Sequence, residues 1–192
     1  MQELKDKIIL SAHKHFLIGG VRWLDLDLVA NDCCITRKLL GQCFKRNELI
    51  DAVIKSKIET YQRAIAAIET EKLEPIEEMT RILNFTESLG YDLSAVLLWD
   101  LRRHYQENYA LIDSFITGSL KKIFKENLTK GINRRIYRKA INEEMLTDTY
   151  FIAILALIEK DSNNLQSELK NVRILEMNSN FLTGLLAEFK ND

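Results

Sequence analysis

The sequence predicts an all-α protein of about nine helices, and two observations support this fold class. Gly and Pro are scarce, since 7 Gly and 1 Pro among 192 residues make up about 4% of the chain, compared with roughly 12% in average proteins. Sandwiches, barrels and doubly wound sheets need many tight turns, and turns use these two residue types. Apolar residues also recur at helical spacing along most of the chain, without strand-like alternation.

The first part of the chain contains three of the predicted helices. The first covers residues 1–18, which carry an apolar stripe and precede a pair of glycines. Asp25 and Thr36 can cap two short helices, over 26–31 and 37–43. Two short helices joined by such a brief turn form a helix-turn-helix layout, whose second helix enters the major groove of DNA.

Six longer helices are predicted to follow. Pro75 suits the first position of one helix, and Asp92 can cap another. Gly90 and Gly131 are expected to end two of them. The predicted ranges are 47–71, 75–90, 93–107, 109–128, 142–160 and 165–189.

Two parts of the chain follow patterns that belong together. The first pattern fits without a gap at Ile8, Ala12, Phe16, Gly20, Leu26, Val29, Ala30, Ile35, Thr36, Leu40 and Phe44, and the run FKRNELIDAV continues it. The second is GINRRIYRKAIN, from Gly131 to Asn142. The first set of residues resembles the DNA-binding domain of TetR-type transcriptional regulators. The second resembles the segment before the penultimate helix of the same family, and the two matches occur in the family's order. The resemblance therefore spans most of the chain.

The resemblance implies a TetR-like fold with two domains. Residues 1–46 would form a helix-turn-helix DNA-binding domain, and residues 47–192 a helical ligand-binding and dimerisation domain. The implied function is that of a transcriptional regulator, most simply a repressor. It would bind a palindromic operator on double-stranded DNA as a homodimer and be released by a small-molecule effector. The sequence leaves activation open and specifies neither the operator, the effector nor the regulated genes.

Six residues are candidates for DNA contact. Affinity for a duplex comes mostly from neutralised phosphates, and specificity comes from contacts to base edges. Arg37 and Gln42 suit base edges, because Arg pairs with guanine and Gln with adenine. The phosphate candidates are Thr36, Lys38, Lys45 and Arg46. The alternative is a set of solvated surface charges.

Several positions in this region depart from the family's pattern. Cys34 replaces the turn Gly, which would cost about 1 kcal/mol if the position needs a positive φ. Gly41 replaces a Tyr that usually contacts phosphate, and Asp25 replaces a hydroxyl at a helix cap. Lys38 stands in place of a Gly, and Cys43 in place of a His or Tyr. An alternative function is therefore a TetR-fold module that binds a ligand or partner without sequence-specific DNA binding.

The larger predicted domain supplies candidates for an effector pocket and for a dimer contact. Aromatic-rich cavities with a few polar groups suit lipophilic small molecules. The pocket candidates are Met79, Leu83, Thr86, Trp99, His104, Tyr109, Phe115 and Ile116, which are otherwise core residues. Apolar stripes on the last two helices would be covered in an isologous dimer. The interface candidates are Phe151, Ile154, Leu155, Ile158, Phe181, Leu182, Leu185 and Phe189.

Other function classes find little support. The three histidines do not have the spacing of metal ligands, and the sequence has no phosphate-binding loop or nucleophile motif. We therefore expect no enzymatic activity, no metal site and no cofactor. The longest apolar run is too short to span a membrane, which predicts a cytoplasmic protein. Cys33, Cys34 and Cys43 are either a thiol switch or small apolar residues. The basic residues of the segment 121–139 are either an anion-binding patch or a solvated helix end.

Overall fold

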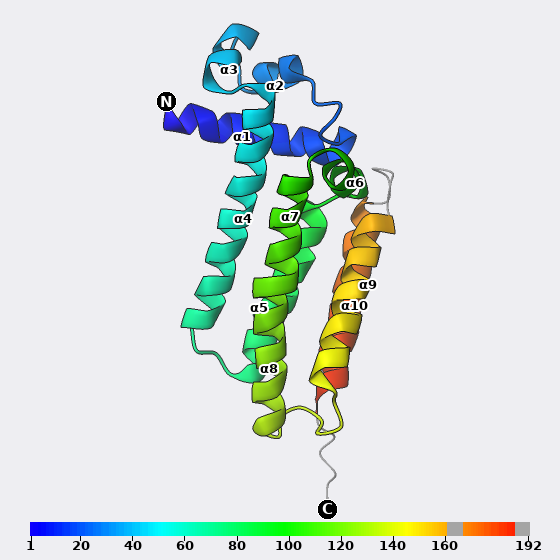
Figure 1. Ribbon diagram of the computed structural model, residues 1–192. Coiled ribbons are helices and arrows are strands. Elements are labelled where there is room, and N and C mark those ends of the chain that lie inside the picture. Colours follow the sequence, from blue (N-terminus) through cyan, green and yellow to red (C-terminus); the bar gives the residue numbers. More distant parts are fainter. Residues whose placement is uncertain (161–166, 187–192) are drawn as a thin grey trace, which may run out of the picture.

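The computed structural model describes residues 1–160 and 167–186 of the chain. The helices among these residues are α1 (Gln2–Gly19), α2 (Leu26–Asp32), α3 (Arg37–Cys43), α4 (Arg46–Thr70), α5 (Pro75–Asp92), α6 (Ala95–His104), α7 (Gln106–Ser114), the π-helical η1 (Phe115–Leu120), α8 (Lys121–Asn133), α9 (Glu143–Lys160) and α10 (Ser167–Leu185). Because α7, η1 and α8 follow one another without a break, they form one rod (Figure 1). The described chain thus has nine helical rods, and the predicted all-α class is confirmed.

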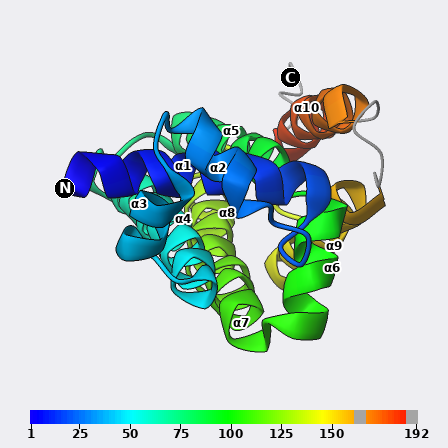
Figure 2. The ribbon, with the colours of Figure 1, turned by 90° about the horizontal axis from the view of Figure 1, so that it is seen from above.

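The helices form a head and a body. In Figure 1, α1 lies across one end of the molecule, with α2 and α3 beyond it, and the long helices extend away from it. The view from above in Figure 2 places α3 and α4 on one side and α6, α9 and α10 on the opposite side. Helix α4 belongs to both parts, because it begins beside α3 and continues along the body.

Local sequence signals explain where the head helices begin. The Asp25 side chain accepts hydrogen bonds from the backbone N–H groups of Asp27 (2.8 Å) and Leu28 (3.4 Å), and Thr36 Oγ1 accepts one from Leu39 N–H (3.2 Å). Each satisfies N–H groups that the first turn of a helix leaves unpaired. The caps predicted for α2 and α3 are confirmed.

Three predicted helix boundaries are wrong, two of them because a glycine expected to end a helix makes a close tertiary contact instead. Helix α5 continues through Gly90 to Asp92, and α8 through Gly131 to Asn133. A Cβ on Gly90 would lie 2.5 Å from Asn171 Oδ1 of α10, and one on Gly131 would lie 2.0 Å from the Tyr137 ring. Both glycines therefore allow close packing. Asp92 does not cap α6, because Ser94 does so, accepting from Leu97 N–H at 3.2 Å.

One hydrophobic core extends from the head into the body. Phe16 of α1 and Leu40 of α3 belong to the same buried cluster as Phe124 of α8 and Phe151 of α9. Burial of this apolar surface is the main force that stabilises the fold. Within residues 1–160 and 167–186, no helix has the length and apolar character needed to cross a membrane.

Candidate nucleic-acid interface

Helices α2 and α3 form a helix-turn-helix unit at the tip of the head (Figure 1). The turn is tight, since Cys34 N–H donates to the Asn31 carbonyl oxygen (2.9 Å) and Ile35 N–H donates to that of Ala30 (3.0 Å). Cys34 has a φ of +55°, so this residue adopts the left-handed conformation that glycine tolerates best. The strain inferred for this position from the sequence is therefore present.

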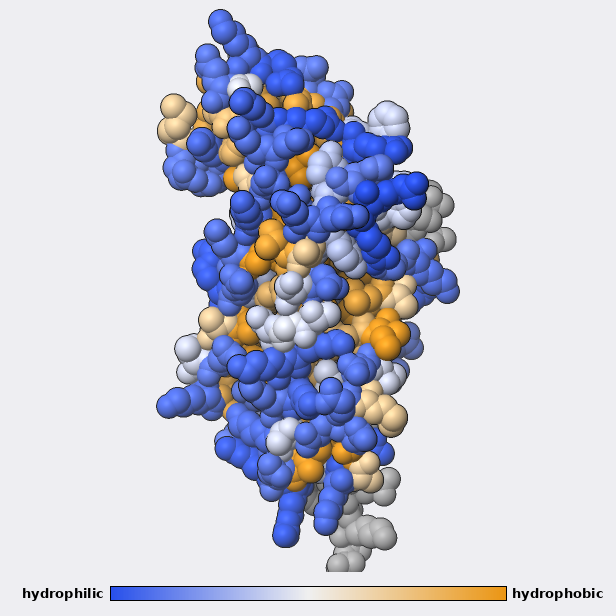
Figure 3. All heavy atoms as spheres, in the orientation of Figure 1, coloured by the Kyte–Doolittle hydropathy of each residue, from blue (hydrophilic) through white to orange (hydrophobic). Residues whose placement is uncertain are grey.

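The packing of α3 leaves most of the helix in contact with solvent. Leu40 is its only fully buried side chain and anchors it against the head core. Five of the six candidate DNA contacts are exposed, and the sixth, Arg46, is half-buried; the exposed ones are Thr36, Arg37, Lys38, Gln42 and Lys45. Figure 3 shows that the surface over this tip is mostly hydrophilic. The structure thus brings these five side chains together at one end of the molecule.

Two of the exposed candidates also have partners inside the head. Arg37 Nε lies 3.6 Å from Asp27 Oδ1 of α2, and both side chains are exposed. Such a pair contributes little to stability, but it orients the guanidinium. Thr36 Oγ1 accepts the capping hydrogen bond of α3, so the hydroxyl hydrogen is directed elsewhere.

The sixth candidate, Arg46, has a different arrangement. Its Nη1 donates to the Leu24 carbonyl oxygen (2.7 Å), and its Nη2 donates to those of Val21 (3.0 Å) and Arg22 (2.7 Å). The guanidinium therefore ties the start of α4 to the loop between α1 and α2. Sequence reasoning missed this role, because the carbonyl groups it satisfies lie more than twenty positions away in the chain.

The head is joined to the body by buried polar contacts as well as by α4. Asp100 of α6 is buried, and its Oδ2 accepts from the backbone N–H of Arg22 at 2.8 Å. Gly20, with a φ of +77°, allows this approach, because a Cβ there would lie 2.4 Å from the same oxygen. This role of Asp100 could not be predicted from the sequence, since a single acid in an apolar helix has no characteristic spacing.

A second polar junction lies where α1, α4 and the end of α5 meet. His13 Nε2 lies 3.0 Å from the Asp92 carbonyl oxygen, to which its N–H form donates, and Lys57 Nζ lies 2.6 Å from Asp92 Oδ1. Burial, together with the positive charge of Lys57, lowers the pKa of His13 below its ordinary value. The imidazole is therefore neutral in the folded state near pH 7.

The cysteines and the basic segment have simple structural environments. All three thiols are free, and burial and the nearby Asp32 carboxylate raise the pKa of Cys33, which disfavours the reactive thiolate. Five basic side chains between positions 121 and 139 form ion pairs: Lys121 with Asp148, Lys122 with Glu126, Lys125 with Glu144, Lys130 with Glu78 and Arg134 with Glu74. This pairing favours a solvated, charge-balanced surface over an anion-binding patch.

The eight predicted pocket residues lie in different environments. Five lie in the core, namely Met79, Leu83, Thr86, Phe115 and Ile116. Thr86 is part of a buried network, since its Oγ1 lies 2.6 Å from the Tyr150 hydroxyl, which donates to Asn178 Oδ1 (2.8 Å). Tyr109 is half-buried. Trp99 and His104 are exposed and line two separate surface hollows.

The predicted dimer stripes lie mostly inside the single chain, which corrects their assignment. Four of these side chains are buried in the core: Phe151, Ile154, Ile158 and Leu185. They cannot contact a second copy while the chain keeps this fold. Leu155, Phe181 and Leu182 are half-buried against the core, and Phe189 lies outside the described residues. The sequence predicts that these stripes are free to contact a second copy, because it does not show that α8 packs against α9 and α5 against α10.

Other apolar side chains of α9 and α10 are exposed instead. Ile152 is 68% exposed, Val172 58% and Leu175 53%. A shallow groove of about 610 Å³ lies between the two helices, and its lining residues are Ala153, Ala156, Leu157, Lys160, Arg173, Glu176, Met177 and Asn180. Figure 3 shows apolar surface over α9 on one side of the body.

The whole chain is similar in fold to solved transcriptional regulators. A TetR transcription regulator from Haloarcula marismortui superposes with a TM-score of 0.69 at 15% identity, over 97% of this chain and 100% of that chain. A transcriptional regulator from Cytophaga hutchinsonii gives 0.66 at 15% identity, over 95% and 98%. FadR from Bacillus subtilis, in complex with stearoyl-CoA, gives 0.64 at 17% identity, over 94% and 98%.

These likenesses establish the fold. No family model matches the chain, and no curated protein matches it significantly in sequence. The similarity in three dimensions covers both the head and the body. The TetR-like fold that the two sequence patterns imply is therefore confirmed.

Proposed function

We propose that this chain is a DNA-binding transcriptional repressor that acts as a homodimer and releases its operator when a small molecule binds. The observation that carries this proposal is the position of α3 at the tip of the molecule, with its polar side chains exposed and only Leu40 anchored. Second helices of helix-turn-helix units contact base edges from such a position. The similar solved structures are transcriptional regulators.

Five exposed side chains in or beside α3 have proposed roles. Arg37 and Gln42 contact base edges, and Lys38, Lys45 and the Thr36 hydroxyl contact phosphates. Arg46 supports the head by fixing the loop before α2, because three carbonyl groups occupy its guanidinium. DNA binding must also break or rearrange the exposed Arg37–Asp27 pair, which costs little in water.

The homodimer is proposed to form through the outer face of α9 and α10. This face carries Ile152, Val172 and Leu175, and the groove between them is lined by Ala153 and Ala156. Small residues let helices approach closely, and a two-fold axis through this groove would pair the same patch on both copies. Burial of exposed apolar side chains drives such an association.

The dimer is tested by changing one exposed residue. Val172→Glu places a charge on the proposed face and is expected to shift the protein from dimer to monomer in sedimentation velocity. Leu111→Glu is the control, because Leu111 is also an exposed apolar residue but lies on α7. A dimer that survives Val172→Glu and Leu175→Glu together would contradict the proposed interface.

DNA binding is tested by selecting genomic fragments with the purified protein at near-physiological salt. A palindromic motif is expected, and Arg37→Ala and Gln42→Ala should each weaken binding by about 1–3 kcal/mol and relax one position of the motif. Lys122→Ala is the charge-matched control for Arg37→Ala, since Lys122 is an exposed cation of the body. An unchanged motif in both variants would contradict the assignment of base contacts.

A second function is favoured by the altered surface of α3. Gly41 leaves the middle of α3 without a side chain, and a Cβ there would meet only Arg37 Nη1, at 3.8 Å. The helix therefore lacks a central contact residue, as in a module that binds a ligand or partner without sequence-specific DNA binding. Recovery of no fragment above background, by a protein that is dimeric and folded, would favour this function over the repressor.

A further inference from the structure

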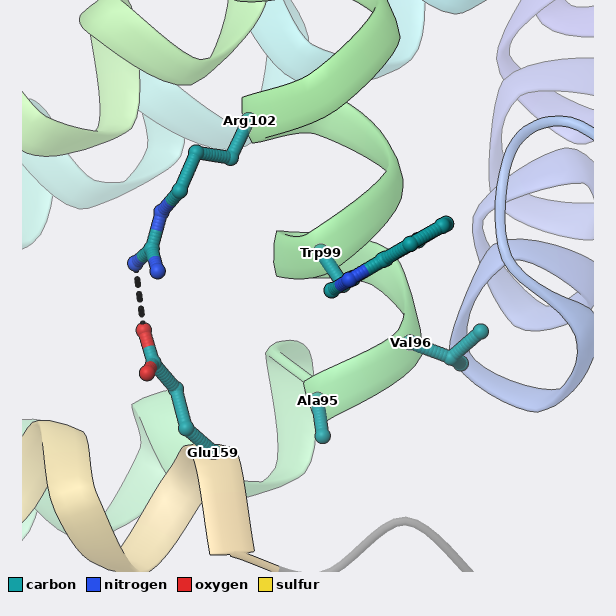
Figure 4. A pocket seen from close by; sticks show the side chains of 5 residues that line it. All are labelled: Ala95, Val96, Trp99, Arg102 and Glu159. Atoms are coloured by element: carbon teal, nitrogen blue, oxygen red, sulfur yellow. Dashed lines mark hydrogen bonds and ion pairs between the residues drawn. The ribbon is translucent and has the colours of Figure 1, made fainter.

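We infer that a hollow between α6 and α9 binds a small planar aromatic carboxylate. The hollow has a volume of about 360 Å³ and is lined by Ala95, Val96, Trp99 and Arg102 of α6 and by Glu159 of α9. This volume lies within the range of small-molecule sites, which combine apolar walls with a few placed polar groups. Figure 4 shows the Arg102–Glu159 pair on one side of the hollow, and Trp99 and Ala95 on the other.

The apolar wall suits a flat ring. Trp99 is 52% exposed, although its indole is one of the largest apolar groups of the chain. The Arg103 guanidinium lies 5.6 Å from the centre of that ring and His104 stacks edge-on against it at 6.0 Å, so neighbours restrain its orientation. An aromatic ligand that covers the indole would remove apolar surface from water and add an aromatic contact.

The polar side of the hollow selects a negative charge. Arg102 Nη2 donates to Glu159 Oε1 (2.6 Å) and to the Tyr109 hydroxyl (3.0 Å). Among the described residues, no hydrogen bond engages Nε or Nη1 of Arg102, so donors remain for a ligand carboxylate. The charge of Glu159 is already compensated by this pairing, whereas Arg102 keeps N–H groups for a ligand, which favours an anion over a cation.

The hollow also lies next to the junction between body and head. Val96 lines it and approaches Gly20 at the end of α1, where a Cβ would lie 3.0 Å from the Val96 side chain. One turn further along α6, Asp100 accepts the hydrogen bond from Arg22. A ligand in the hollow would therefore act on the helix that supports the head. Its role as an effector site rests on the proposed function, whereas its ability to bind a ligand does not.

The experiment compares two probes of the same shape by NMR. The chain has two tryptophans, and Trp23→Phe assigns their two indole N–H signals. 2-Naphthoate is expected to shift the Trp99 signal at about tenfold lower concentration than uncharged 2-naphthamide, because only the acid gains charge-assisted hydrogen bonds. Trp23, which is 73% exposed in the head, should not respond. Equal shifts of both signals would show non-specific association and overturn the site.

Variants of the ion pair decide the sign of the selected charge. Arg102→Gln should weaken 2-naphthoate binding about tenfold and leave 2-naphthamide unchanged. Glu159→Gln should strengthen 2-naphthoate binding several-fold, because it removes the competing carboxylate. Arg81→Gln is the matched control, since Arg81 is an equally exposed partner of a glutamate on the remote α5. Weaker binding in Glu159→Gln would overturn the inference.

These experiments distinguish a failure of the proposed binding site from a failure of the proposed function. Selective 2-naphthoate binding supports the site even for a protein that recovers no DNA fragment. If the protein does bind DNA, 2-naphthoate should lower its affinity for the selected fragment, and DNA should weaken 2-naphthoate binding by the same factor. Binding of 2-naphthoate without this reciprocal effect would overturn the effector role.

Discussion

The contact between Gly131 and Tyr137 gives the sharpest test of how the body is packed. Tyr137 is buried, and its hydroxyl lies 2.7 Å from the Pro75 carbonyl oxygen and 2.9 Å from Asn127 Oδ1. Its ring lies so close to the backbone of α8 that a Cβ on Gly131 would stand 2.0 Å from a ring carbon. Gly131→Ala therefore forces the ring or the helix to move.

The expected cost follows from opposing terms. Ala in place of Gly favours a helix by about 1 kcal/mol. Overpacking of a core costs about 1–3 kcal/mol, and displacement of Tyr137 also weakens the hydrogen bond that its single hydroxyl hydrogen donates, worth about 1 kcal/mol. The net loss in the free energy of unfolding is about 1–3 kcal/mol, which corresponds to a fall in Tm of roughly 2–12 °C for a chain of this size.

The assay is thermal and urea unfolding at a fixed protein concentration, because dimerisation would otherwise change the apparent stability. Gly118→Ala is the control in the same continuous rod, since a Cβ there meets nothing within 4 Å. It should leave Tm unchanged or raise it. Combining Gly131→Ala with Tyr137→Leu should couple strongly, because the two residues share one contact. A Gly131→Ala protein as stable as Gly118→Ala would refute this reasoning.

Three further predictions concern the head. Cys34→Gly should raise the free energy of unfolding by about 1 kcal/mol, because glycine adopts the positive φ of this position without strain. Cys33→Gly should lower it, because Cys33 has an ordinary φ of −86°. Urea unfolding of both variants checks this. Arg46→Met should lower the free energy of unfolding by about 1–3 kcal/mol, because three carbonyl groups lose the guanidinium that donates to them. Lys45→Ala is the control and should leave the stability unchanged. Similar unfolding of the two variants would contradict the role assigned to Arg46. His13 has a lowered pKa when folded, so the unfolded state binds the extra proton as pH falls below about 6.5, and stability falls with it. In His13→Gln that fall between pH 7.5 and 5.5 should be smaller, and an unchanged pH dependence would count against a neutral buried imidazole.

The helices could be predicted from sequence because their signals are local. Asp25, Thr36 and Pro75 act within one turn of the residues they position, so their roles follow from the adjacent sequence. The sequence wrongly predicts helix ends at Gly90 and Gly131, because glycine occurs both at helix ends and at positions of close packing. Only the three-dimensional structure shows Asn171 and Tyr137 packed against them.

The candidate site could be predicted only in part. The exposure of the polar side chains of α3 could be predicted from the motif, in which Leu40 is the residue that is buried in the head core. The engagement of Arg46, Asp100 and Glu159 depends on partners far away in the chain, which leave no local pattern. The same limit explains why the sequence predicts Phe151 and Ile154 at an interface, whereas the structure buries them in the core. Their helix is apolar on several sides, so its sequence does not select one face.

The central proposal is that two α3 helices of a dimer bind successive major grooves, and footprinting of a selected DNA fragment tests it most directly. We predict two protected half-sites related by a palindrome, with centres about 10–10.5 base pairs apart or a multiple of this spacing. Val172→Glu, which should prevent dimerisation, should remove protection of both half-sites together. A single protected site without two-fold symmetry, or protection that is unchanged in this variant, would contradict the proposal.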